Sequence, residues 1–133
     1  MELGKGIYQK LINSKLFGSR VYPFIAGERA SNPCAVYSLL NTDRAHTLTK
    51  DCGYTYERYQ ISIFANTPKE AADLSKKVRK IFQDFKGPLG DQEVQGVLIQ
   101  TEMLTQNTYG TAVYGTEPDY QAVLEFEFQY QEK

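Results

Sequence analysis

The chain has 133 residues, of which 41% are hydrophobic and 23% are charged, and its formal net charge is −1. This length favours one domain over residues 1–133 with its own core, and this composition excludes a disordered chain. A net charge so close to zero gives no overall attraction to nucleic acid or to membranes. No apolar run is long enough to span a bilayer, and no signal peptide is evident, so we expect a cytosolic protein. Two cysteines, Cys34 and Cys52, are too few for a disulfide framework, and we expect both to be free thiols.

The N-terminal residues 2–13 predict a helix, because apolar side chains recur at a spacing of four. Gly4 and Gly6 each cost such a helix about 1 kcal/mol relative to alanine, so it needs a neighbour to pack on. The apolar stripe consists of Leu3, Ile7 and Leu11.

A short apolar segment, Val21–Ala26, follows and is interrupted by Pro23. It therefore predicts an edge strand or an extended segment. Residues 34–40 predict a compact strand. Residues 41–53 are polar without any period, so they predict a loop between two strands. Because long loops are often functional, we interpret this one as a candidate contact region that contains Arg44 and His46.

Residues 54–65 alternate as a strand with one side on a core: Tyr59, Ile61, Ile63 and Ala65 share one face. Thr67 then predicts a helix start, with Pro68 at the first helical position and Glu70 as its capping-box partner. The helix has an apolar stripe that reaches Phe85, and Gly87-Pro88 ends it.

Two more strands are predicted after this helix. In residues 94–103, we expect Val97, Ile99 and Met103 to share one face. In residues 120–130, apolar and polar side chains alternate most clearly, so one face belongs to the core and the other is wet. Residues 105–118 between them are rich in Gly, Thr and Tyr and predict a protruding arm.

The predicted order is therefore α-β-β-α-β-β. It indicates an α+β domain with a mainly antiparallel sheet of about four strands, one helix packed on a sheet face, and an N-terminal helix.

No pattern in the sequence indicates catalysis. His46 lies among polar loop residues without an evident partner, and Glu125 and Glu127 on the wet strand face are typical of a solvated surface. There is no phosphate-binding loop, no dinucleotide-binding turn and no zinc-binding helix motif. We therefore expect no enzyme activity, no cofactor, no metal and no small-molecule substrate.

Two surface features remain open to interpretation. The predicted helix after Thr67 carries several basic residues, which suits a small nucleic-acid-binding regulator or, more simply, a solvated face with paired charges. Tyr109 and Tyr114 lie in the predicted arm, where tyrosines suit a protein interface.

Five segments of the sequence together form a familiar pattern. They are Val21-Tyr-Pro-Phe-Ile-Ala26, Asn32-Pro-Cys-Ala-Val-Tyr37, Tyr59-Gln-Ile-Ser-Ile-Phe-Ala65, Glu70-Ala-Ala-Asp-Leu-Ser-Lys-Lys-Val-Arg79 and Asp119-Tyr-Gln-Ala-Val-Leu-Glu-Phe126. With these segments, the chain resembles the tail completion proteins of long-tailed bacteriophages and prophages, which are related in fold to tail terminators. The resemblance covers nearly the whole chain, but it rests on structural residues and transfers no individual functional residue.

This resemblance implies a virion structural protein that forms a ring, commonly a hexamer, on the head-proximal end of the tail tube. The implied partners are further copies of the chain, the tail tube protein and a head completion or connector protein. Arg44, His46, Tyr109 and Tyr114 are the hypothetical interface residues. If the wet face of the last strand lines the lumen, Glu125 and Glu127 repel DNA phosphates and let the genome pass without specific binding. The alternatives are a connector or minor tail component of the same apparatus, or the nucleic-acid-binding regulator.

Overall fold

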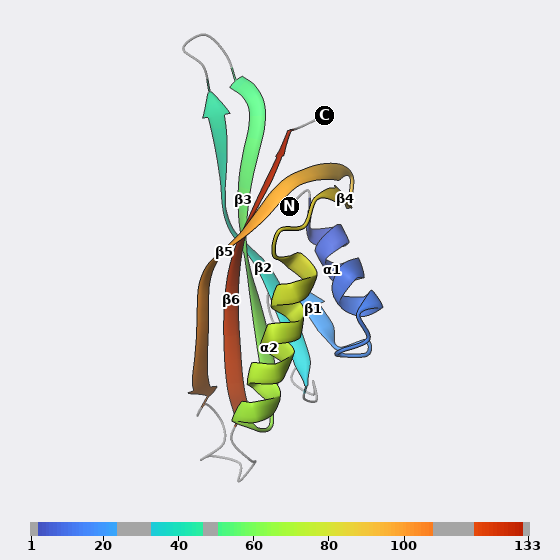
Figure 1. Ribbon diagram of the computed structural model, residues 1–133, viewed down its shortest axis with the longest axis vertical. Helices are drawn as coiled ribbons and strands as arrows, with labels where there is room; N and C mark the ends of the chain where they lie inside the picture. The colour runs from blue at the N-terminus through green and yellow to red at the C-terminus, as the bar shows by residue number, and fades with distance from the viewer. Residues whose placement is uncertain (1–2, 24–32, 47–50, 108–118, 132–133) are drawn as a thin grey trace.

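The computed structural model consists mostly of one β-sheet with two helices on the same side of it (Figure 1). The described residues are 3–23, 33–46, 51–107 and 119–131. In chain order, their helices and strands are α1 (Gly4–Asn13), β1 (Val21–Pro23), β2 (Cys34–His46), β3 (Asp51–Ala65), α2 (Pro68–Phe82), β4 (Gly87–Leu89), β5 (Gln92–Asn107) and β6 (Asp119–Gln131).

The sheet has the strand order β1-β2-β3-β6-β5-β4. The strand β1 pairs with β2 in parallel, and every other neighbouring pair in the described chain is antiparallel. The long strands twist and curl as a half-barrel around the side that carries the helices (Figure 1).

The predicted fold class was therefore wrong. A four-strand, mainly antiparallel sheet in the order α-β-β-α-β-β is replaced by a six-strand mixed sheet. Two strands are absent from that order. β1 lies within Val21–Ala26, where an edge strand or an extended segment was predicted but not counted, and β4 has only three residues, too few to show alternation. Each also contains a proline, Pro23 or Pro88, which is tolerated at a sheet edge.

The core lies between the two helices and the sheet face that they cover. The predicted stripe of α1 is buried at Leu3, Ile7 and Leu11, as is the predicted strand face from Tyr59 to Ala65. The rings of Phe82, Phe126 and Phe128 contact one another, with centroids 5.6 to 6.3 Å apart. Burial of such a side chain contributes about 1.5–3 kcal/mol, so this aromatic cluster fixes α2 on β6.

The prediction of a loop at residues 41–53 was also wrong. Strand β2 continues to His46 and β3 begins at Asp51, so most of these residues form a hairpin that extends past the helices (Figure 1). Asn41, Thr42 and Asp43 are all exposed although they are consecutive. Because residues 41–44 of β2 are exposed on both faces, this part of the strand carries no hydrophobic period from which it could be predicted.

Strand β5 contains irregularities, so some of its side chains lie on the sheet face opposite to the one predicted. Val97 is buried and Ile99 packs against the core, but the register shifts between Ile99 and Thr101. Such a bulge moves the following side chains to the opposite faces. Met103 therefore lies opposite Val123 and is about half exposed, so the prediction that it shares a face with Val97 was wrong.

Helix α2 begins as predicted and ends earlier. The Thr67 side chain accepts a hydrogen bond from the Glu70 backbone amide at 3.1 Å, and Pro68 is the first helical residue. The helix ends at Phe82, because Gln83 is extended and Asp84 has a positive φ of 61°. Phe85 nevertheless packs against the core as a partly buried side chain.

Candidate functional site

The sheet face opposite the helices carries the two predicted lumen residues. Glu125 and Glu127 alternate on β6 with buried Leu124, Phe126 and Phe128, so both carboxylates lie on the uncovered face. Both side chains are intermediate in exposure. The neighbouring strands place further polar side chains on this face, namely Gln60 and Ser62 of β3 and Thr101 of β5.

Glu127 is the centre of a small polar network on this face. Arg58 Nη2 lies 3.8 Å from Glu127 Oε2, and the side-chain amides of Gln100 and Gln129 donate to the same carboxylate at 3.5 and 3.3 Å. The Tyr54 hydroxyl in turn donates to Gln129 at 3.4 Å. Because the Arg58–Glu127 pair is partly solvated, it contributes little to stability and mainly reduces the local negative charge.

The predicted interface residues of the loop lie on the projecting part of the β2–β3 hairpin. Arg44 is exposed and pairs with Thr55, whereas the His46 backbone pairs with Asp51 at the end of β2. These two positions are close to each other and separate from Glu125 and Glu127. Tyr109 and Tyr114 lie outside the described residues.

Strand β3 carries a buried carboxylate, Glu57, that the sequence analysis did not single out. Glu57 accepts hydrogen bonds from the hydroxyls of Tyr59 at 3.0 Å and Tyr130 at 2.8 Å. Burial, together with the nearby Glu57 carboxylate, raises the pKa of Tyr59 far above its usual range. Period-two alternation could have revealed this site, because Glu57 is in phase with Tyr59 and Ile61. Its buried position and its satisfied oxygens indicate a structural polar cluster.

Two long strand edges are open in the described part of the chain. On one side, β1 covers residues 35–37 of β2, and no described residue pairs as a strand with the edge over Ser38–Asp43, here called the β2 open edge. On the other side, β4 covers only residues 92–94 of β5, and the following residues 95–107 form the β5 open edge. Unpaired backbone donors and acceptors at such an edge allow another strand to pair there.

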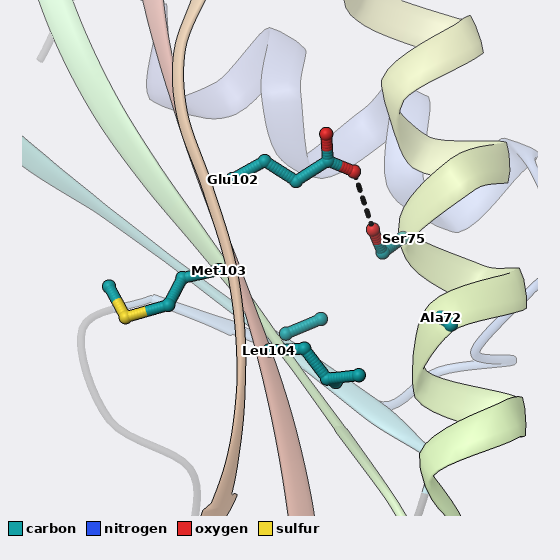
Figure 2. A pocket seen from close by; sticks show the side chains of 6 residues that line it. Ala72, Ser75, Glu102, Met103 and Leu104 are labelled. Atoms are coloured by element: carbon teal, nitrogen blue, oxygen red, sulfur yellow. Dashed lines mark hydrogen bonds between the residues drawn. The ribbon is translucent and has the colours of Figure 1, made fainter.

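A groove runs between α2 and the β5 open edge (Figure 2). It has a volume of about 360 Å³, and Glu102 and Leu104 reach toward the helix while Met103 points away from it. The Ser75 hydroxyl donates to Glu102 at 3.3 Å, and Arg79 donates to the same carboxylate at 3.4 Å. These two contacts connect Glu102 of β5 to α2 across the groove.

The described residues contain no group of three or more His, Cys, Asp or Glu side chains that could hold a metal ion. Cys34 of β2 is buried and is not part of a disulfide. Across the described ranges, neither helix has the length and apolar character needed to cross a membrane.

Comparison with known proteins gives a likeness in structure. No protein-family model and no curated protein matches this sequence. Among solved structures, the chain is similar to a chain described as "Virion of native gene transfer agent (GTA) particle", with a TM-score of 0.67 and 15% sequence identity. The likeness covers 94% of this chain and 91% of that chain. At this identity, the likeness shows a shared fold over nearly the full length of both chains.

Proposed function

We propose that this protein is a virion structural protein of a long-tailed bacteriophage or prophage, which caps the head-proximal end of the tail tube and joins the tail to the head. The observation that carries the proposal is the full-length likeness to a chain of a gene transfer agent virion. The sequence resemblance to tail completion proteins supports the same role independently. Fold alone does not determine function, so the position in the virion needs a direct test.

Ring assembly is the mechanism that we propose for this role. Copies of the chain assemble in the host cytoplasm as a ring, expected to be a hexamer, and remain at the tail of the finished virion. One face of the ring contacts the tail tube protein, and the other contacts a head completion or connector protein. The work is done by binding and requires neither catalysis nor a cofactor. Two unlike open edges on one sheet suit a ring, because a head-to-tail interface closes by rotation.

The uncovered sheet face is the proposed lining of the lumen. It carries Glu125 and Glu127. Arg58 lies on the same face, but its positive charge is paired with Glu127. A face of this composition repels DNA phosphates or has no net attraction for them, so the genome passes without specific binding. A ring structure with lysines of α2 in the lumen and both glutamates outside would contradict this orientation.

The proposed position is tested by a stop codon at Tyr59 in the parent phage or inducible prophage, followed by electron microscopy of the lysate. We expect DNA-filled heads lying apart from tails, with tails overlong or bare at the head-proximal end. The matched control is a synonymous change at the same codon, and a plasmid copy of the intact gene restores joined particles. Normal joined virions from the stop mutant would remove the protein from the head–tail junction.

A second candidate function, a nucleic-acid-binding regulator, rests on the exposed lysines of α2. Lys76, Lys77 and Lys80 are exposed on this helix, whereas Arg79 is bound to Glu102. A regulator is retained on DNA at low salt and released steeply as salt rises. We expect no such retention of the purified protein, and a triple Lys→Gln variant of these residues serves as the matched comparison. Strong retention that the variant loses would favour the regulator.

A further inference from the structure

We propose that residues 108–118 of one copy bind as an added strand in the groove between α2 and the β5 open edge of the next copy. This inference rests on the ring assembly proposed above and identifies one contact that joins neighbouring copies. The groove consists of described residues, and the segment that occupies it is identified by its sequence, since residues 108–118 lie outside the described ranges.

The acceptor is a regular and uncovered stretch of β5. Residues 101–107 pair with consecutive residues of β6 without a register shift. On the other side of this stretch, no described residue pairs with it as a strand. Residues 102–105 are all exposed although they are consecutive, so neither face of the strand is covered here in a single copy. An edge with free backbone donors and acceptors accepts an added strand from another chain.

Apolar side chains line the groove beside this stretch. Leu104 is 48% exposed and reaches toward α2 (Figure 2). Ala72 of α2 and Ala122 of β6 line the groove with it. Alternate side chains of an added strand point to the same side of the sheet, so every second residue of the occupant faces these three side chains. The groove therefore suits an extended segment that carries apolar side chains.

The charges beside the groove favour an occupant that also carries a carboxylate. Lys76 is exposed and lies one helical turn after Ala72, on the groove side of α2. The Glu102 carboxylate in the groove already accepts two hydrogen bonds from α2. The two acidic residues of α2, Glu70 and Asp73, line a separate hollow. The groove side of the helix therefore presents a positive charge to the occupant.

Residues 108–118 have the composition that this groove requires. Their sequence is Thr-Tyr-Gly-Thr-Ala-Val-Tyr-Gly-Thr-Glu-Pro, in which Glu117 is the single charged residue. The run Thr111-Ala-Val-Tyr114 lies between two glycines and is rich in the β-branched and aromatic side chains that favour strands. This run supplies the apolar side chains, and Glu117 supplies the carboxylate for Lys76.

The length and position of the segment allow it to reach a neighbouring copy. Asn107 and Asp119 pair with each other, so about two to five residues would suffice to join them. The longer segment extends up to about 18 Å and back, at about 3.3–3.6 Å per residue. Leu104 and Ala122 are only about 10 Å along the strands from these two ends, and rotation in a ring preserves heights along its axis. Since residues 102–105 are exposed in a single copy, the occupant belongs to a neighbour.

Disulfide trapping tests this contact. Val113→Cys and Leu104→Cys are introduced together with Cys52→Ser; the native Cys34 is buried. Particles and concentrated purified protein are oxidised mildly and run on non-reducing gels. We expect a ladder of covalently linked copies whose largest member gives the ring size. Val113→Cys with Ala72→Cys, on the opposite wall of the groove, should give the same ladder.

The matched control is Val113→Cys with Leu98→Cys. Leu98 is 49% exposed on the same strand as Leu104, but it lies before the bulge of β5 and outside the groove. This pair should give no ladder, and neither should any single cysteine variant. In the trapping background, Lys76→Glu should reduce the yield of the ladder several-fold. Lys77→Glu, beside the separate hollow of α2, should leave the yield unchanged.

The outcomes separate this inference from the proposed function. Particles that contain the protein without a ladder from either groove pair would overturn the docking and leave the virion role standing. A ladder in the purified protein, with no protein in particles, would support the docking and contradict the virion role. A disulfide within one copy would overturn the docking in favour of a segment bound in its own groove. Dimers of a single variant, a ladder from the control pair, or no ladder in both samples would overturn it as well.

Discussion

At the scale of single residues, the most informative side chain is Glu57, a carboxylate buried in the core. It remains stable there because two tyrosine hydroxyls donate to its two oxygens, and the backbone of Leu3 hydrogen-bonds one of these hydroxyls. A buried charged group without such partners would cost several kcal/mol. The cluster therefore connects β3, β6 and the start of α1.

The substitution Glu57→Gln tests this account of the cluster. Hydrogen bonds to a charged group contribute about 1.5–3 kcal/mol, against about 0.5–1.5 kcal/mol for neutral partners. We therefore expect the free energy of unfolding, measured by urea denaturation, to fall by about 1–3 kcal/mol. Glu93→Gln, at an exposed position of β5, is the matched control and should change it by less than about 0.5 kcal/mol. Equal stabilities for the two variants would contradict the structural role of Glu57.

The tyrosine of this cluster predicts a dependence of stability on alkaline pH. Because the pKa of Tyr59 is raised in the folded state, the folded protein keeps a proton that the unfolded chain loses above pH of about 10. The stabilisation is fully present below that pH and is lost as pH rises further. Relative to Tyr59→Phe, we expect the unfolding free energy of the unsubstituted protein to fall by up to about 1.4 kcal/mol per pH unit above pH 10. Parallel pH curves for both proteins would refute this prediction.

At the scale of elements, a glycine determines how closely α1 approaches β4. A Cβ atom on Gly6 would overlap the backbone nitrogen of Gly90 and lie 2.8 Å from the carbonyl carbon of Leu89. The sequence analysis treats Gly6 as a cost to the helix, whereas the structure shows that it provides the contact which that helix needs.

The substitution Gly6→Ala therefore has an expected effect opposite to that of helix propensity. Propensity alone would stabilise the helix by about 1 kcal/mol, but the overlap should reduce the unfolding free energy by about 1–3 kcal/mol. Gly96→Ala is the matched control, because its Cβ would have no atom within 4 Å. Thermal unfolding of both variants provides the measurement, and a stabilised Gly6→Ala protein would contradict the close approach.

Some secondary-structure elements could be predicted from the sequence and others could not. The start of α2 and strand β6 were confirmed, since Thr67 forms the expected cap and one face of β6 is buried from Ala122 to Tyr130. Both have a strong local signal, a capping side chain or a long alternation against the core. The end of β2 beyond Asn41 was missed because residues 41–44 are exposed on both faces of the strand. The facing of Met103 was missed because a bulge leaves no mark in the alternation.

At the scale of the whole molecule, the sheet ends on both sides in edges that are only partly covered. These edges result from the strand order. Strand β5 pairs with β6 along its length on one side, whereas on its other side β4 pairs with only three of its residues. No local pattern reveals such an order, and this explains why the candidate surface could not be predicted residue by residue. Alternation alone did place Glu125 and Glu127 on the uncovered face. Their role in a lumen, like that of Arg44 and His46 at an interface, remains a prediction.

The central claim, that the protein occupies the junction between head and tail, is tested most directly by gold-labelled antibodies on purified particles. The antibody is raised against the whole protein, and particles from the Tyr59 stop mutant serve as the negative control. We expect label at one site per particle, where the tail meets the head, or at the head-proximal tip of separated tails. Label along the length of the tail would indicate a tube or minor tail component, and particles without label would contradict the account.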